Sequence, residues 1–481
     1  MFQNNLLMGA ASAGGAGLVS VENSALFNRA NSEYLDRTPL SSGSGTTFTF
    51  RTLFYATQNT STSSALAWAS AASGYIGSGF YYNTNQTLTF FFNSNAGSQW
   101  QLLPTGTPLF RDNAWYDICW QIDTTQASIS NCGTLEINGV NFPLSTQVDG
   151  GSYSQNANTH FNSSSFVQNI GRAYGNAGGS IGSYCDGYLA ETVMIDGANL
   201  SASNFGEFDT TGLYWTPKSS TDIKALTFGT NGFYLDNTTN AQTDASGEGN
   251  NFTNNNTVVT STHTPTNLYT LLSPLALLAT GGTLSNGNKT ILTGASQYSA
   301  AMTTLGVNFG KWYIETRMDA SGGAATYQVG IATTFSRGTT DFVGKLNGEI
   351  NYGSNGSNYI EGSNNTSWGA TYTTGDRIGM ELDLDAGTPA CEFFKNDVSQ
   401  GTINLPGADG PYYFAVTGYV GDNTNTISVY AEEDDWSYAP SSATFLALNT
   451  TNIAEATTRT QSNPYEYWNN ILYTGNGTAS T

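Results

Sequence analysis

Three carboxylates in one short segment are the feature of this 481-residue sequence that most resembles a catalytic apparatus. Glu381, Asp383 and Asp385 alternate with two leucines. On a β-strand, alternate side chains share a face, so the three acids would lie on one side and the leucines on the other. Paired carboxylates are the catalytic groups of most glycoside hydrolases. The interpretation that we favour is a strand with a solvent-facing acidic side and an apolar underside.

Other catalytic groups are sparse. The two histidines, His160 and His263, lie in polar surroundings and have no Cys or His at ligand spacing, so we expect solvated loop histidines and no zinc or iron centre. No G-x-S-x-G motif marks a nucleophile, and no glycine-rich loop continues into the Lys-Ser/Thr of a phosphate site. The sequence therefore predicts a protein that is not an enzyme.

Calcium is the one cofactor for which the sequence offers ligands. Asp244, Ser246, Glu248 and Asn250 present alternate oxygens on a glycine-interrupted loop. Calcium binds clusters of such oxygens, so this loop is a candidate calcium site. The acidic run 432–435 is a second candidate. Solvated turns are the alternative interpretation of both segments.

Exposed aromatic residues in loop-like stretches rich in Gly, Ser and Asn are the candidates for ligand binding. Sugars stack their apolar faces on exposed rings, while amides and carboxylates hold the hydroxyls. The alternative is that these rings close the ends of a core or contact a neighbouring subunit. The candidate ligand-binding residues are Tyr75, Phe80, Tyr81, Tyr82, Tyr352, Tyr359 and Trp368.

The composition indicates a β protein and narrows the class of partner. Charged residues make up only 11%, aromatic residues reach 13%, and 15 basic against 36 acidic residues give a net charge of −21. Clustered Lys and Arg are missing, so we expect neither nucleic acid nor an anionic membrane as a partner, and no apolar run is long enough to insert into a bilayer. The four cysteines lack C-x-x-C spacing and are expected to be buried free thiols.

Strand patterns separated by turn residues fill both halves of the chain, and no segment keeps a helical period. The polar stretch 236–266 reads as a loop between domains. The sequence predicts an all-β protein of two β-sandwich (jelly-roll type) domains in series. The predicted strands are Thr46–Tyr55, Thr87–Phe92, Trp115–Ile122, Thr134–Val140, Tyr188–Ile195, Lys311–Arg317, Tyr327–Ala332, Arg377–Leu384, Cys391–Lys395, Tyr412–Gly418 and Thr426–Tyr430.

The second half resembles a SPRY domain over residues 311–450. Four ordered blocks carry the resemblance: GKWYIE from Gly310, VGIA from Val329, GDRIGMELDLD from Gly375, and CEFFKND from Cys391. Asp397 departs from the family pattern, in which Gly usually follows Asn in this hairpin. The acidic strand from Glu381 lies where SPRY proteins normally carry one.

The first half is similar to the concanavalin-like, laminin-G-like modules of phage structural proteins over residues 24–215. The matching blocks include EYLDRTP from Glu33, WY at Trp115, IGR from Ile170 and DGYLAE from Asp186. The blocks GEF, WTPK, GFYL and DASGEGNN after Gly206 match the same proteins. Such modules often hold calcium at a rim.

The resemblance implies a division into five segments. We expect an N-terminal segment at 1–23 that is a candidate anchor or oligomer contact, a laminin-G-like sandwich at 24–215, a connecting segment at 216–280, a SPRY-like sandwich at 281–454, and a C-terminal segment at 455–481 that resembles the start of a further module.

The resemblance also implies a function. We expect a non-enzymatic phage virion protein, a tail or head fibre or appendage that binds host-surface polysaccharide and is assembled in the host cytoplasm without a secretory signal. Other virion proteins would be its partners, and a homotrimer or another symmetric homo-oligomer its assembly. A capsid decoration protein and a polysaccharide depolymerase are the alternatives.

Overall fold

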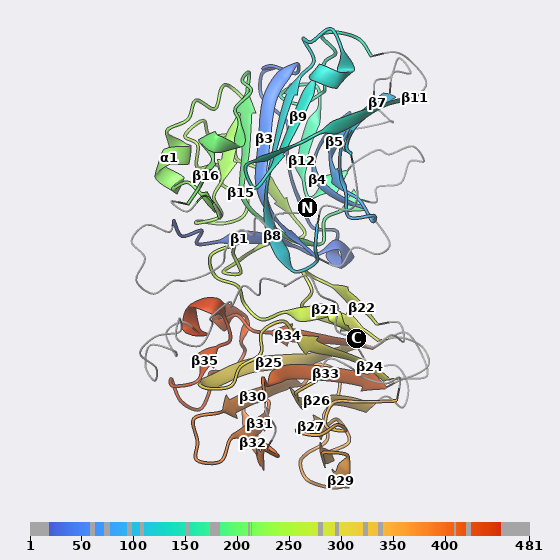
Figure 1. Cartoon of the computed structure of the whole chain (residues 1–481), viewed down its shortest axis with the longest axis vertical. Coiled ribbons are helices and arrows are strands. Elements are labelled where there is room, and N and C mark those ends of the chain that lie inside the picture. Colours follow the sequence, from blue (N-terminus) through green and yellow to red (C-terminus); the bar gives the residue numbers. More distant parts are fainter. Residues whose placement is uncertain are drawn as a thin grey trace, which may run out of the picture.

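The chain is built almost entirely of strands, which confirms the predicted all-β class (Figure 1). The computed structural model describes residues 19–57, 63–71, 77–93, 99–105, 110–149, 153–173, 183–209, 212, 214–277, 282–293, 298–320, 326–334, 340–407, 410–419 and 425–453. In these ranges the helical segments are η1 (Arg29–Asn31), η2 (Ile129–Asn131), η3 (Ala202–Asn204), α1 (Ser220–Lys224) and η4 (Glu433–Asp435), and residues 450–453 are also helical. None of these is long and apolar enough to cross a membrane.

The first sandwich consists of two large antiparallel sheets, which we call sheet A and sheet B. Sheet A has the order β10 (Val140–Phe142), β9 (Gly133–Ile137), β8 (Ala114–Asp123), β3 (Thr47–Ala56), β15 (Gly187–Asp196), β1 (Ser24–Phe27), β20 (Val259–Ser261), with β18 (Phe233–Leu235) also on β15. Sheet B has the order β11 (Leu144–Asp149), β7 (Gln99–Pro104), β6 (Leu88–Asn93), β5 (Gly77–Tyr82), β4 (Ser64–Ser70), β12 (Val167–Ile170), β2 (Tyr34–Arg37), β19 (Thr253–Asn255). Two short hairpins flank them: β13 (Arg172–Ala173) with β14 (Ser183–Tyr184), and β16 (Gly206–Phe208) with β17 (Trp215–Pro217).

Aromatic rings fill the space between sheets A and B. Phe50 of β3 stacks on Phe80 of β5 with 4.6 Å between ring centroids, and Phe80 also contacts Trp120 of β8. These rings are buried. Because large aromatic rings bury much apolar surface, this layer contributes strongly to the hydrophobic stabilisation of the first sandwich.

The second sandwich also has two antiparallel sheets, which we call sheet C and sheet D. Sheet C has the order β21 (Leu272–Leu277), β24 (Tyr298–Thr303), β33 (Tyr413–Tyr419), β26 (Thr326–Ala332), β27 (Ile350–Gly353), β28 (Asn358–Ile360), β29 (Ser363–Asn365). Sheet D has the order β22 (Thr283–Ser285), β23 (Thr290–Leu292), β34 (Thr426–Tyr430), β25 (Lys311–Ala320), β30 (Arg377–Asp383), β31 (Ala390–Lys395), β32 (Val398–Asn404), with β35 (Leu446–Ala447) parallel to β25. Trp312, Phe393 and Phe414 are buried in one core between these sheets.

The expected connecting segment at 216–280 is part of both sandwiches. β18 and β20 lie in sheet A, β19 lies in sheet B, and β21 begins sheet C. The sequence suggested that the polar stretch 236–266 is a loop between domains. This prediction is wrong, because the stretch contributes strands to the first sandwich. Its strands are only three residues long, so their pairing with distant strands determines them more than local sequence does.

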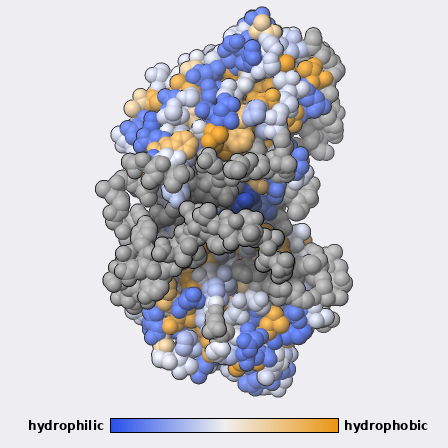
Figure 2. Space-filling view, in the orientation of Figure 1, coloured by the Kyte–Doolittle hydropathy of each residue, from blue (hydrophilic) through white to orange (hydrophobic). Residues whose placement is uncertain are grey.

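The two sandwiches meet at a hydrogen-bonded junction (Figure 1). The backbone N–H of Gly287, between β22 and β23, donates to Asp186 Oδ1 at 3.0 Å. Asn288 Nδ2 donates to Asn113 Oδ1 at 2.6 Å. In the view of Figure 2, polar and apolar residues are interspersed over both sandwiches.

Candidate functional site

Sheet B presents an aromatic platform on its outer face, away from the core. Trp68 of β4 lies over two glycines of β5, and a Cβ on Gly79 would fall 2.2 Å from the Trp68 ring. The Trp68 ring centroid is 5.3 Å from that of Tyr81 and 6.0 Å from that of Phe91, to which it is parallel within 18°. Trp68 is buried, whereas Tyr81 and Phe91 are half-buried. The glycines thus allow three rings to form one layer on the sheet surface.

Amides and hydroxyls surround this platform and form a shallow cavity of about 290 Å³ with it. Asn83 Nδ2 donates to Thr89 Oγ1 at 2.8 Å, and Thr87 Oγ1 donates to Asn85 Oδ1 at 2.6 Å, so the polar groups are held in place by one another. The lining residues are Ser63, Tyr81, Asn83, Asn85, Thr87, Thr89, Phe91, Gln101, Leu103 and Ser183. None of these is charged, and burial raises the pKa of the Tyr81 hydroxyl, so the lining offers rings and neutral hydrogen-bonding groups.

Of the aromatic residues predicted from the β5 region, only Tyr81 belongs to this cavity. Phe80 and Tyr82 point into the core and are at most 1% exposed, so the prediction that they are exposed loop aromatics is wrong. The segment is a strand, and alternation places 77, 79 and 81 outward and 78, 80 and 82 inward. Tyr75 lies outside the described residues. The sequence analysis did not identify Trp68 and Phe91 as candidates. The same alternation predicts that Phe91 points away from the core, because its neighbours Phe90 and Phe92 point into it.

The aromatic residues predicted in the second sandwich do not form an exposed surface. Tyr352 is fully buried, which contradicts the prediction, and its ring packs on the half-buried Trp368. Trp368 also contacts the core ring of Phe393. Tyr359 packs against Phe342 with 4.8 Å between ring centroids. Tyr352 and Trp368 thus extend the second core, which is the alternative that the sequence left open.

The candidate calcium loop uses its oxygens internally. The Asp244 carboxylate accepts hydrogen bonds from the backbone N–H groups of Tyr234, Ser246 and Asn250, and from the Ser246 hydroxyl. Asn250 Oδ1 accepts from the Arg37 guanidinium at 2.6 Å, which brings a positive charge to the loop. Glu248 is exposed. The oxygens of Asp244 and Asn250 thus already accept hydrogen bonds within the chain, and the calcium site at Asp244, Ser246, Glu248 and Asn250 stays a prediction.

The acidic run 432–435 is likewise tied into the junction. Glu432 Oε2 accepts from the Ser261 hydroxyl at 2.8 Å, and Lys289 Nζ forms ion pairs with Glu432 and Asp435. Tyr269 donates to Glu433 at 2.6 Å. Among the described residues, no three His, Cys, Asp or Glu side chains are grouped as a metal site.

The acidic strand of sheet D also has structural partners. Glu381 is buried and accepts from the N–H and the hydroxyl of Ser441. Asp383 pairs with Lys311 at 2.7 Å, and Asp385 accepts from the Gly310 N–H at 2.8 Å. Leu382 and Leu384 face the core, as expected, but the acidic face is covered at Glu381 instead of facing solvent.

Both histidines are buried, so the expectation of solvated loop histidines is wrong. His160 bonds to the Ser78 hydroxyl at 2.9 Å and stacks on Phe92. His263 Nδ1 accepts from the Tyr269 N–H at 3.1 Å, and its ring lies 4.6 Å from that of Tyr55. Burial lowers the pKa of His160 to about 4 and that of His263 to about 3, so both are neutral and act as packing residues. The four cysteines are buried free thiols, as predicted.

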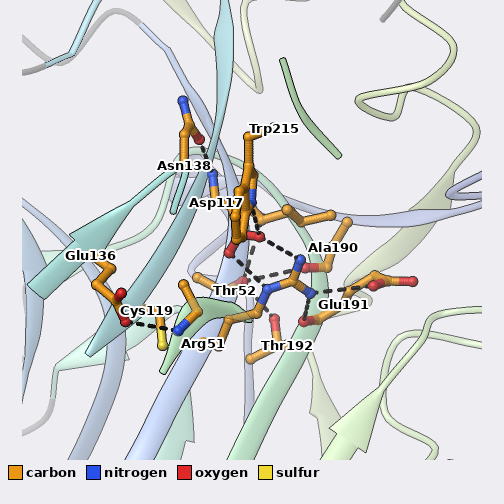
Figure 3. Close-up of polar contacts among 12 residues, drawn as sticks. Arg51, Thr52, Asp117, Cys119, Glu136, Asn138, Ala190, Glu191, Thr192 and Trp215 are labelled. Carbon is orange, nitrogen blue, oxygen red and sulfur yellow. Dashed lines mark hydrogen bonds and ion pairs between the residues drawn. The ribbon is translucent and has the colours of Figure 1, made fainter. Parts of the chain in front are cut away.

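A buried cluster of three charged side chains lies on the face of sheet A that points away from sheet B (Figure 3). The Arg51 guanidinium donates to both carboxylate oxygens of Asp117, at 2.8 and 2.9 Å, and reaches Glu191 at 3.2 Å. The Trp215 indole N–H donates to Asp117, and the Tyr234 hydroxyl donates to Glu191. Burial raises the pKa of Glu191, and the guanidinium opposes the shift. All five residues are at most 4% exposed, so a substrate has no route to these groups, and the cluster is structural.

Comparison with known proteins finds solved structures only. No protein-family model matches the chain, and no curated protein sequence matches it. A human SPRY domain is 19% identical, with a TM-score of 0.26, over 32% of this chain and 94% of its own. The SPRY domain of human HERC1 is 16% identical, with a TM-score of 0.29, over 34% of this chain and 99% of its own. A SAP-like pentraxin of Limulus polyphemus is 12% identical, with a TM-score of 0.32, over 50% of this chain and 96% of its own. Likenesses of this extent carry no functional argument.

Proposed function

We propose that this chain is a non-enzymatic phage virion protein, a tail or head fibre or appendage, that binds a glycan of the host surface. In this proposal a laminin-G-like sandwich precedes a SPRY-like one, as the sequence resemblance implies. The observation that carries the proposed binding is the pair of half-buried rings of Tyr81 and Phe91, which pack on the buried Trp68 beside an uncharged rim of amides and hydroxyls.

The chemistry of the platform favours a neutral or weakly charged sugar. Ring faces stack on the apolar faces of sugars, and fixed amides and hydroxyls can hold the sugar hydroxyls. A charged ligand would find no counter-charge in the lining. With a net charge of −21, the chain as a whole repels polyanions. Neutral segments of bacterial surface polysaccharide fit both conditions.

The buried and paired state of the acidic residues supports a binding protein over a depolymerase. Glu381, Asp383 and Asp385 each have a structural partner, and the platform carries no carboxylate. Hydrolysis needs two carboxyl groups about 5–9 Å apart on either side of a bound sugar. The reducing ends released from host polysaccharide should therefore stay at the background level.

The test is a Tyr81→Ala variant assayed against an array of neutral capsular and O-antigen polysaccharides. Removing one stacking ring should weaken binding about tenfold. Tyr359→Ala is the matched control, because Tyr359 is also a half-buried tyrosine but lies in the second sandwich. Unchanged circular dichroism and thermal midpoint establish that both variants fold. Equal binding by the wild type and Tyr81→Ala would refute the proposed site.

A further inference from the structure

β11 (Leu144–Asp149) is an open edge of the first sandwich, at the upper right of Figure 1. Within the described part of the chain it pairs only with β7, through all six of its residues. The four residues 145–148 are exposed, and Val148 retains 39% of its surface. An edge strand of this kind presents one side of its backbone N–H and C=O groups for pairing with a further strand.

The only charged residue of this edge strand is Asp149 at its end, so its central residues lack the usual protection. Proteins commonly place charges, Pro or a bulge on an edge strand to prevent pairing with another chain. From Ile137 to Val148 the sequence contains no charged residue, although the chain carries 36 acidic residues in all. The register of β11 on β7 runs without a bulge from Leu144 to Asp149. Two copies that each carry a net charge of −21 repel each other. This repulsion is weakest where an uncharged stretch of one copy lies against the same stretch of the other.

We propose that two copies of this chain associate by antiparallel pairing of β11 with β11, on a two-fold axis at Thr146. Centred there, the pairing sets Leu144 opposite Val148 of the second copy, which matches apolar with apolar. Ser145 lies opposite Gln147 of the second copy, and Thr146 lies opposite itself. Residues opposite each other in an antiparallel pair have their side chains on the same face of the sheet. The two-fold axis must therefore pass through a residue, and not between two residues, for the same face of both copies to lie on one side of the joined sheet.

The self-complementarity of this segment is the reason to name a second copy as the occupant. A two-fold interface requires one patch to match itself, and residues 144–148 do so at every position. The contact joins two eight-stranded sheets into one continuous sheet. A single strand pair buries little surface, so we expect a concentration-dependent dimer that gains strength when further contacts in a particle hold the copies together. The proposal is independent of the glycan proposal.

The first test is sedimentation equilibrium of the full chain between about 1 and 200 µM. The wild type should move from monomer to dimer across this range. Thr146→Glu places two like charges opposite each other on the axis and should abolish the dimer. Thr402→Glu is the matched control, an exposed threonine on the edge strand β32 of the other sandwich, and should leave the dimer unchanged. A wild type that stays monomeric, or a dimer lost only in Thr402→Glu, would overturn the proposal.

A second measurement tests the register. Residues directly opposite in an antiparallel pair have Cα atoms about 4.5–5.5 Å apart, which lies within the range that a disulfide spans. Under mild oxidation, Thr146→Cys should therefore form a covalent dimer, while Thr402→Cys should not. The four native thiols are buried and should not interfere. If the wild type and Tyr81→Ala bind glycan equally while the wild type still dimerises, only the proposed function fails.

Discussion

Asp186 at the junction between the sandwiches should make the stability of the whole chain depend on pH in an unusual direction. Its side chain accepts from the Gly287 N–H at 3.0 Å and is 8% exposed. Burial raises the pKa of this carboxyl from 3.8 to about 6, against the opposing effects of the Gly287 hydrogen bond and the Arg29 charge. The folded state therefore binds the Asp186 proton more tightly than the unfolded state does.

The sign and size of the effect follow from this difference. Below pH of about 4 the carboxyl is protonated in both states and costs nothing; as the pH rises through about 6, the folded state must carry a buried charge, and stability is lost. The interval from 3.8 to about 6 corresponds to about 3 kcal/mol at pH 8. Asp186→Asn keeps an oxygen for the Gly287 N–H and removes the titration. We expect the variant to gain up to about 3 kcal/mol over the wild type at pH 8, relative to pH 4.

Urea unfolding of the wild type and of Asp186→Asn at pH 4 and pH 8 gives the free energy of unfolding of each protein at each pH. The predicted gain is the stability difference between the two proteins at pH 8 minus their difference at pH 4. Asp434→Asn is the control, because Asp434 belongs to the same junction but is exposed. Its substitution should change stability by less than about 0.5 kcal/mol at either pH. The reasoning would be refuted if Asp186→Asn stabilised the chain no more at pH 8 than at pH 4.

Two further substitutions test the elements that hold the first sandwich together. Arg51→Met leaves two buried carboxylates without their cation and should lower the free energy of unfolding by about 3–5 kcal/mol. Arg317 pairs with Asp319, but its side chain is 41% exposed, so Arg317→Met should lower the free energy of unfolding by less than about 1 kcal/mol. Similar losses for both variants in chemical denaturation would contradict the structural role of the cluster. Gly79→Ala places a Cβ 2.2 Å from the Trp68 ring and should displace the indole, seen as a shift in tryptophan fluorescence and as weaker glycan binding. Gly387→Ala, where the Cβ would meet nothing within 4 Å, should leave both signals unchanged.

The long strands of the core could be predicted from sequence, because their apolar alternation is strong. The predicted Thr426–Tyr430 coincides with β34, and Thr46–Tyr55 differs from β3 by one residue at each end. Gly77–Tyr82 was instead interpreted as a loop, since Gly and Ser are rare in strands. Gly77 and Gly79 are required because the Trp68 indole of the neighbouring strand β4 packs directly over them. Local strand propensity does not reflect this contact between strands.

The partners of the acidic residues could not be predicted for a related reason. The sequence alone does not tell whether a carboxylate contacts a substrate, water or a backbone N–H. The hydrogen-bond donor becomes known only from the fold. Glu381 finds Ser441, sixty positions away, and Glu432 finds Ser261, more than 170 positions away. In a strand protein such long-range pairing is the rule, so an acidic pattern is weak evidence for catalysis.

Uncharged surfaces are the informative ones in this chain. With 36 acidic residues and only 15 basic ones, most of the exterior repels a second copy and any anionic partner. A surface that meets another molecule must therefore be one from which carboxylates are missing. The platform around Tyr81 and the edge at Thr146 both satisfy this condition, and both belong to sheet B. Pairing at β11 would then place two glycan-binding faces on one continuous sheet, so that a polymer bound at one platform is held near the other.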